Sequence, residues 1–388
     1  MSTRLPPEAS VASVERYRPE LRPEVRVSDE LLLGNGTVHL IKNTENGQSF
    51  KVGTREHFLI SRMDGSRSLD EIGAEYAGRY GRRLSDANWQ QLLGMLGTRG
   101  LLAGAPAAAP ARDAAPEAPE APQSGTAPKA GRTLLRGTLP LVADADATAG
   151  RLHHAAGFLL SRWWMVPLLT LVVVMEATLV LRAGELALAT RETFTNPVLL
   201  TATGALLWLS TALHELAHGV VAKHYQGRVS EIGLRWRLPS VIMYCTVDNY
   251  LYLPTRWARV ATALAGAVMN LLFLLPFCAL WLLAPVDDAT QDALAGLLFL
   301  GSIQAFAMLV PLPPLDGYKI AGQALGATEL AASSAAYLRL ALRRDALAAG
   351  YPRRARIAYT AYPLLCLLVL GALVAGAVSL TYFLLATP

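Results

Sequence analysis

The chain has few charged residues and few cysteines. Only 17% of its 388 residues are Asp, Glu, Lys or Arg, whereas 53% are hydrophobic. This balance points to a membrane protein and not to a single soluble domain. The three cysteines, Cys245, Cys278 and Cys366, are scattered and include no Cys-x-x-Cys pair. The sequence therefore predicts no disulfide framework.

Two further absences limit the possible function. The first twenty residues contain no apolar core, which argues against a secretory signal peptide and predicts a cytoplasmic N-terminal region. The net charge of +5 is spread as arginines near apolar segments and forms no basic block. Nucleic-acid binding is therefore not predicted.

Long apolar runs occupy the second part of the chain. Each of five segments is long enough to cross a hydrocarbon layer of about 30 Å. They are residues 163–183, 197–222, 257–284, 290–310 and 357–386. Arginine and lysine concentrate in the loop between the second and third segments and in the loop after the fourth. The positive-inside rule makes those two loops cytoplasmic and predicts five crossings from a cytoplasmic N-terminus to an external C-terminus.

One apolar segment carries ionisable residues that need an explanation. No charged residue occurs from 197 to 213, and then His214, Glu215 and His218 follow in an HExxH pattern. Histidines four residues apart lie on one face of a helix and can share a Zn²⁺ ion, with the intervening Glu as general base. The alternative is a pair of buried histidines packed among apolar side chains. Because a charged group at membrane depth needs a compensating partner, the metal site is favoured.

A third metal ligand is needed, because a catalytic zinc site has three protein ligands and one open position. The candidate is Asp316, which follows the fourth apolar segment within a proline-rich break. By itself an Asp-Gly pair is a common turn. Combined with HExxH at the same membrane depth, it indicates a ligand. His224 lies six residues after His218, which turns it away from this face, so a solvated position is expected for it.

These motifs together resemble those of the site-2 proteases, which are intramembrane zinc metalloproteases. HExxH on one membrane helix and Leu-Asp-Gly at the end of a later one are typical of that family, and the segment from Gly266 to Asn270 is similar to its Gly-x-x-x-Asn element. The resemblance covers about residues 150–388 and is closest to the putative peptide zinc metalloproteases associated with ribosomally made, modified peptides. Met308 and Ala267 depart from the family pattern at positions that are not metal ligands.

The resemblance implies roles for individual residues. His214, His218 and Asp316 would hold Zn²⁺, and Glu215 would act as the general base. Asn270 would contact the substrate or the developing oxyanion, with helix packing as the alternative. From the residues themselves, 251–254 and the apolar residues before them are expected to form a hairpin or a re-entrant piece. A strand edge there could pair with an unwound substrate, with an ordinary surface hairpin as the alternative.

Residues 1–102 are expected to form a separate soluble domain. The pattern predicts two strands around an Asn-Gly turn over 38–53 and helices over 54–65, 68–81 and 85–100. Ser68 and Glu71 form a capping-box pair at the start of the second helix. The arrangement resembles the PqqD-like winged helix, which binds precursor peptides, although a purely structural winged helix fits as well. Residues 103–135, rich in Ala and Pro, are expected to be a linker.

The sequence thus predicts a mainly α, polytopic cell-membrane protein with about five transmembrane helices and a small cytoplasmic α+β winged-helix-like domain. Residues 136–388 would be the metallopeptidase domain, cleaving a modified precursor peptide for leader removal or export. A peptide exporter is a further candidate partner. Two alternatives remain: a regulatory site-2 protease acting on a membrane-bound anti-sigma factor, and a non-proteolytic peptide-binding protein for immunity or transport. Retention of Glu215 favours an enzyme, because a binding protein needs no general base.

Overall fold

A computed structural model describes residues 17–103, 135–237, 240–248 and 250–386. The predicted linker, 103–135, lies outside these residues except at its two ends. The chain divides into two compact units. Residues 17–103 make up most of the described part of the first unit, and the second contains nearly all of residues 135–386.

The first unit contains a small antiparallel sheet built around one long strand. Its strands are β1 (Val25–Val27), β2 (Leu31–Leu33), β3 (Gly36–Asn43) and β4 (Ser49–Gly53). β1 and β2 pair with successive parts of β3, and β4 pairs with β3 along residues 38–42. The hairpin predicted over 38–53 is therefore confirmed. β1 and β2 were not predicted, because three-residue strands carry too little alternation to be recognised.

Three helices follow the sheet: α2 (Thr54–Ile60), α3 (Leu69–Tyr80) and α4 (Asp86–Thr98). The capping box at the start of α3 is confirmed, with Ser68 accepting from the Glu71 amide and Glu71 accepting from the Ser68 amide. The prediction that α2 continues to Gly65 is wrong. Residues 63–65 instead pair with the extended segment 19–21, through Leu21 N to Met63 O and Gly65 N to Pro19 O. That pairing replaces the last turn of the helix.

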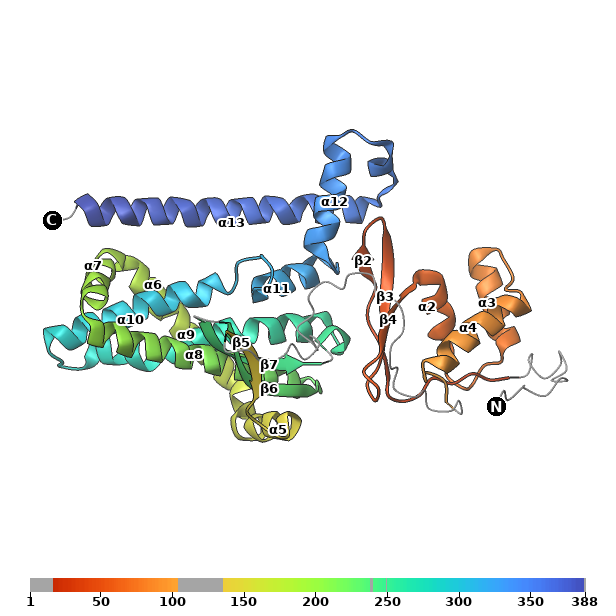
Figure 1. Ribbon diagram of the computed structural model, residues 1–388, viewed down its shortest axis with the longest axis horizontal. Coiled ribbons are helices and arrows are strands. Elements are labelled where there is room, and N and C mark those ends of the chain that lie inside the picture. The colour runs from red at the N-terminus through yellow and green to blue at the C-terminus, as the bar shows by residue number, and fades with distance from the viewer. Residues whose placement is uncertain (1–16, 104–134, 238–239, 249, 387–388) are drawn as a thin grey trace. The chain divides into compact units, whose positions relative to one another are not determined.

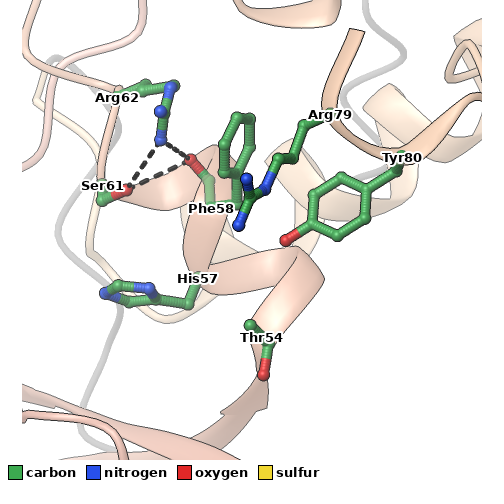
Figure 2. Close-up of a pocket in the computed structure, with 7 residues that line it drawn as sticks. All are labelled: Thr54, His57, Phe58, Ser61, Arg62, Arg79 and Tyr80. Carbon is green, nitrogen blue, oxygen red and sulfur yellow. Dashed lines mark hydrogen bonds between the residues drawn. The ribbon is translucent and has the colours of Figure 1, made fainter. Parts of the chain in front are cut away.

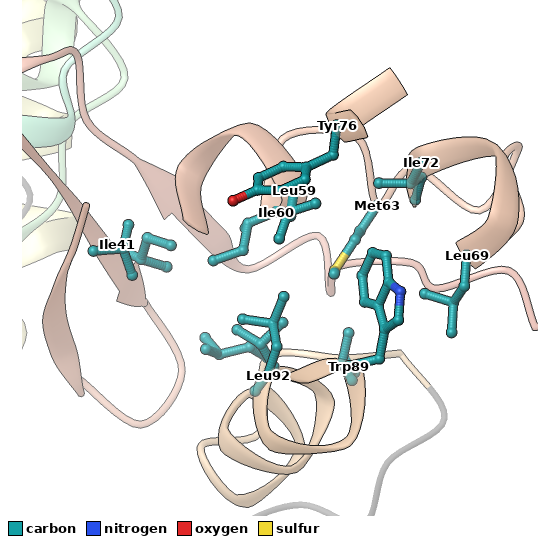
Figure 3. Close-up of a cluster of buried hydrophobic side chains, with 13 residues drawn as sticks. Ile41, Leu59, Ile60, Met63, Leu69, Ile72, Tyr76, Trp89 and Leu92 are labelled. Carbon is teal, nitrogen blue, oxygen red and sulfur yellow. The ribbon is translucent and has the colours of Figure 1, made fainter. Parts of the chain in front are cut away.

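One hydrophobic core joins the sheet to the three helices (Figure 3). Ile41 from β3, Ile60 from α2, Ile72 from α3 and Leu96 from α4 are fully buried within it. Burying a side chain of this size stabilises a fold by about 1.5–3 kcal/mol. The first unit therefore has a core of its own, as expected for a separate domain.

The second unit is mainly helical. Its helices are α5 (Ala145–Ala156), α6 (Arg162–Leu181), α7 (Ala183–Thr195), α8 (Pro197–His224), α9 (Arg256–Leu283), α10 (Asp288–Ala307), α11 (Asp316–Leu325), α12 (Leu330–Leu342) and α13 (Arg353–Ala386), with short 3-10 turns at η1 (Gly157–Leu160), η2 (Tyr250–Tyr252) and η3 (Ala346–Gly350).

Four of the described helices, α6, α8, α9 and α13, are long and apolar enough to cross a membrane. This agrees with a polytopic membrane protein. The fifth predicted segment, 290–310, is the helix α10, which falls short of the others in apolar character because it includes Gln291, Asp292 and Gln304. The five-crossing orientation needs α10 as a crossing and therefore stays a prediction.

α8, α9 and α10 lie side by side in the second unit (Figure 1). Asn196 caps α8 by accepting from the amides of Val198 and Leu199, and Pro197 occupies its first turn, where no amide donor is needed. α7, which the sequence did not predict, packs against α10. Gly296 permits this contact, because a β-carbon there would overlap the Thr193 hydroxyl.

A three-stranded antiparallel sheet lies against α8. β5 (Arg136–Pro140) pairs with β6 (Val229–Arg237), which pairs with β7 (Ser240–Val247). The β6–β7 hairpin contains the apolar residues before Leu251, where a hairpin was expected, whereas Leu251 and Tyr252 themselves belong to the 3-10 turn η2. β5 comes from the segment before α5. Ala145 and Ala149 of α5 pack with Val229 and Ile232 of β6 in a small core. This core fixes the hairpin beside α8.

Candidate metal centre

Two histidines of α8 face the same interior space. His214 and His218 are one helical turn apart, and their side chains are only 4% and 8% exposed. Their Nε2 atoms lie 3.2 Å apart. The four-residue spacing, which predicted that the two histidines share a metal ion, therefore brings their Nε2 atoms together.

Asp316 completes this group from the start of α11. α10 ends at Ala307, and the residues up to Leu315 form the proline-containing break that the sequence predicted. Asp316 Oδ2 lies 3.0 Å from Nε2 of both histidines, and the carboxylate is buried. Gly317 permits the close approach, since a β-carbon there would overlap the carbonyl of Leu309. The structure thus brings together residues that are about a hundred positions apart.

The three ligand atoms have the spacing of a metal site. In a tetrahedral site with metal–ligand bonds of about 2.0 Å, the ligand atoms lie about 3.3 Å from one another. The observed separations of 3.0, 3.0 and 3.2 Å are close to that edge length. Among the described residues, this is the group of buried His and Asp side chains that could hold a metal ion. The residues present therefore fit a metal with three protein ligands.

α9 fixes the orientation of both histidine rings. Nδ1 of His218 lies 2.6 Å from the backbone carbonyl of Thr262, so Nδ1 carries the proton and Nε2 is free to bind a metal. Gly266 lies against His214, and a β-carbon at this position would overlap the imidazole ring. The glycine of the Gly-x-x-x-Asn element therefore serves to let α9 approach the metal helix. Neither contact follows from the local sequence.

Glu215 lies beside the metal group without joining it. Its side chain is half-buried, and Oε2 accepts a hydrogen bond of 3.2 Å from the backbone amide of Cys245 on β7. A carboxylate in this position can accept a proton without competing for the metal. The role of Glu215 as general base stays a prediction.

Asn270 lies in the interface between α9 and α8. It is 1% exposed, and its Oδ1 accepts a hydrogen bond of 3.0 Å from Ser210, one turn before His214. Its Nδ2 has no hydrogen-bond partner among the described residues, nor has Nδ1 of His214. The side chain therefore bridges two helices and retains a free donor. A contact with substrate stays a prediction.

His224 is not part of the metal group. It is the last residue of α8 and is exposed, and its Nδ1 lies 3.3 Å from Nε2 of His153. The expectation that His224 lies off the metal-binding face agrees with this arrangement. Sequence reasoning did not find two other residues near the centre, Thr262 and Lys319. A basic residue one helical turn after Asp316 was the available signal for Lys319.

The first unit carries a second, smaller candidate site. An open hollow of about 400 Å³ lies between α2 and α3 (Figure 2). Its lining combines aromatic rings with cations, namely Thr54, His57, Phe58, Ser61, Arg62, Arg79 and Tyr80. Arg62 pairs with Glu75, whereas Arg79 has no carboxylate partner among the described residues. A hollow of this kind suits an acidic side chain that carries some apolar surface.

His57 makes the stability of the first unit sensitive to acid. Burial and the neighbouring His39, whose ring stacks on it at 3.5 Å, lower the pKa of His57 from 6.5 to about 4. Between these values the unfolded chain binds a proton at His57 and the folded chain does not. Stability therefore rises with pH across this window and is lost as the pH falls from 6.5 towards 4.

We expect His57→Gln to flatten this dependence. Thermal unfolding of residues 1–102 at several pH values would measure it for both proteins, and the carboxylates common to both cancel in the comparison. The effect is reduced by solvent screening, because the ring is only half-buried. Parallel profiles for the two proteins would contradict the prediction.

A comparison with known families agrees with the geometry of the metal group. Residues 202–291 match the model of Peptidase family M50. This range contains His214, Glu215 and His218 together with Gly266 and Asn270, and ends before Asp316. No match to a curated protein or to a solved structure was found. The match covers about a quarter of the chain, and it makes this part of the second unit similar to a metalloprotease family.

Proposed function

We propose that this chain is a zinc metalloendopeptidase that cleaves a ribosomally made, modified precursor peptide at the cell membrane. The observation that carries the proposal is the convergence of His214, His218 and Asp316, whose ligand atoms lie within 3.2 Å of one another. The two histidines and Glu215 belong to α8, a helix apolar enough to span a membrane, and Asp316 approaches from α11. Two imidazoles and one carboxylate form a donor set that suits a catalytic zinc ion.

Glu215 has the role of general base in this proposal. Zn²⁺ bound here would supply Lewis acidity, lowering the pKa of water to about 7 and polarising the scissile carbonyl. Glu215 accepts the proton of the attacking water and passes it to the leaving amine. The Cys245 amide holds the carboxylate on the hairpin side of α8, which is the side from which a peptide can approach.

The outer edge of β7 supports a place for the substrate. Among the described strands, β7 pairs with β6 alone. On its other side, the carbonyl of Val241 accepts from Trp208 Nε1 at 2.8 Å and the Cys245 amide donates to Glu215, so these groups point towards α8. A peptide in an extended conformation could pair with this edge by displacing these side-chain contacts. Its scissile bond would then lie beside the metal ligands.

The first unit supplies the proposed recognition of the precursor. β4 pairs with β3 alone among the described strands, so its outer edge can accept a peptide strand. Thr54, which follows the last residue of β4, belongs to the hollow that contains Arg79. A leader peptide running along β4 could place an acidic side chain in this hollow. Tethering recognition to cleavage in one chain raises the local concentration of substrate to about the millimolar range.

The cellular setting belongs to the same proposal. We place the protein in the cell membrane with residues 1–102 in the cytoplasm, where a ribosomal product is available, and with a peptide exporter as a further partner. Cleavage of a membrane-bound anti-sigma factor is the second candidate. It is favoured only by the match to the site-2 protease family, which does not distinguish between substrates.

The substrate assignment is tested by peptide binding. We expect residues 1–102 to fold alone and to bind a precursor leader encoded near this protein. Arg79→Glu should weaken that binding by about tenfold, which corresponds to about 1.4 kcal/mol. Arg82→Glu is the matched control, since Arg82 is an exposed arginine outside the hollow. Calorimetric titration measures both variants.

Deletion of residues 1–102 completes this test. The shortened chain should process the same precursor more slowly than the full chain does. If no co-encoded peptide binds and the shortened chain processes at an undiminished rate, the substrate class returns to that of a general site-2 protease.

A further inference from the structure

The two oxygen atoms of Asp316 have different partners. Oδ2 faces both histidines at 3.0 Å, whereas Oδ1 accepts a hydrogen bond of 2.8 Å from Nζ of Lys319. Lys319 lies one helical turn after Asp316 on α11, so the short α11 supplies both the carboxylate and its cation. The carboxylate is 7% exposed and the lysine side chain is 37% exposed. The ion pair therefore closes the solvent side of a buried acid.

The different partners of Oδ1 and Oδ2 matter because a carboxylate can bind a metal through one oxygen or through two. With His214 and His218, one oxygen of Asp316 makes three protein ligands and leaves a fourth position open. Two oxygens would fill that position. A catalytic zinc site keeps one position open for water or substrate.

The fixed backbone of α11 also helps to keep Oδ2 facing the histidines and Oδ1 facing Lys319. The Gly317 amide donates to the Met308 carbonyl at 2.9 Å, and Gly317 lies too close to Leu309 for any side chain. The first turn of α11 is therefore anchored to the break that precedes it. Rotation of the Asp316 carboxylate about its own side-chain bonds remains, and the Lys319 ammonium restrains that rotation.

We propose that Lys319 is a positioning residue that holds Asp316 as a single-oxygen ligand and so keeps one coordination position open. The proposal rests on the proposed metal-dependent function. It gives a role to a cation that lies beside the metal group and that is not itself a ligand. Outer partners of metal ligands commonly change metal affinity or activity by about 10- to 100-fold when they are removed.

The test uses the full chain in detergent or nanodiscs, loaded with Co²⁺ as the metal probe. Lys319→Met removes the cation and keeps much of the side-chain length, whereas Lys319→Arg keeps the cation. Lys223→Met is the matched control, because Lys223 forms a similar 3.0 Å pair with Asp146 away from the ligands. The visible absorption of bound Co²⁺ reports coordination number, since four-coordinate Co²⁺ absorbs more strongly than five-coordinate Co²⁺.

We expect Lys319→Met to bind Co²⁺ with a weaker absorption, which indicates an added oxygen ligand, and to lose activity by about 10- to 100-fold. Lys319→Arg and Lys223→Met should resemble the wild-type protein. Loss of metal by Lys319→Met alone would also support a positioning role that depends on charge. An unchanged spectrum and activity in Lys319→Met, or loss of metal by Lys319→Arg as well, would overturn the proposal. Failure of the wild-type chain to bind metal would instead contradict the proposed function itself.

Discussion

Glu215→Gln is expected to retain the metal and to lose turnover by at least about 100-fold. General acid–base catalysis contributes about 10²- to 10⁴-fold to a rate, and the substitution removes the proton acceptor without removing a ligand. Glutamine has nearly the shape of glutamate, and its side-chain oxygen can still accept the hydrogen bond from the Cys245 amide. The local structure should therefore persist.

Two measurements on the same preparation check this expectation. Metal content by mass spectrometry should match that of the wild-type protein, and cleavage of a precursor peptide should be strongly reduced. Cleavage by Glu215→Gln at the normal rate would exclude the proposed mechanism. A protein that binds and passes on a peptide without cleaving it would then be the better interpretation.

Removing any one of the three ligands is expected to abolish stable metal binding. His214→Ala, His218→Ala and Asp316→Ala should each lower metal affinity by more than about 100-fold, because loss of a direct ligand exceeds the effect of losing an outer partner. In each variant the metal content should fall from about one ion per chain towards zero after dialysis against a weak chelator. Activity should fall with it.

His224→Ala is the matched control for these substitutions. His224 lies on the same helix, six residues after His218, but pairs with His153 and not with the metal group. The His224→Ala variant should retain its bound metal ion. Equal loss of metal from His224→Ala would show that the effect is a general unfolding of α8, whereas full metal content in Asp316→Ala would remove Asp316 from the ligand set.

Some features of this protein follow from the sequence alone, because they depend on neighbouring residues. Histidines four positions apart must share a helix face, and a capping box needs only Ser68 and Glu71. A long apolar run with few charges indicates a membrane helix wherever it packs. For this reason the converging histidines, the start of α3 and four apolar helices could be predicted.

Other features depend on segments far apart in the chain, and only the tertiary structure decided them. The carbonyl of Thr262 sets the tautomer of His218, and Gly266 makes room for His214, yet both residues lie on α9. α2 ends before Gly65 because residues 19–21 pair with residues 63–65. β5 pairs with β6 across nearly a hundred residues. Local pattern carries no information about such partners, because the free energy that selects them comes from burial and hydrogen bonding between elements. The sequence by itself identified the residues of the metal group, and packing decided their distances and the partners that orient them.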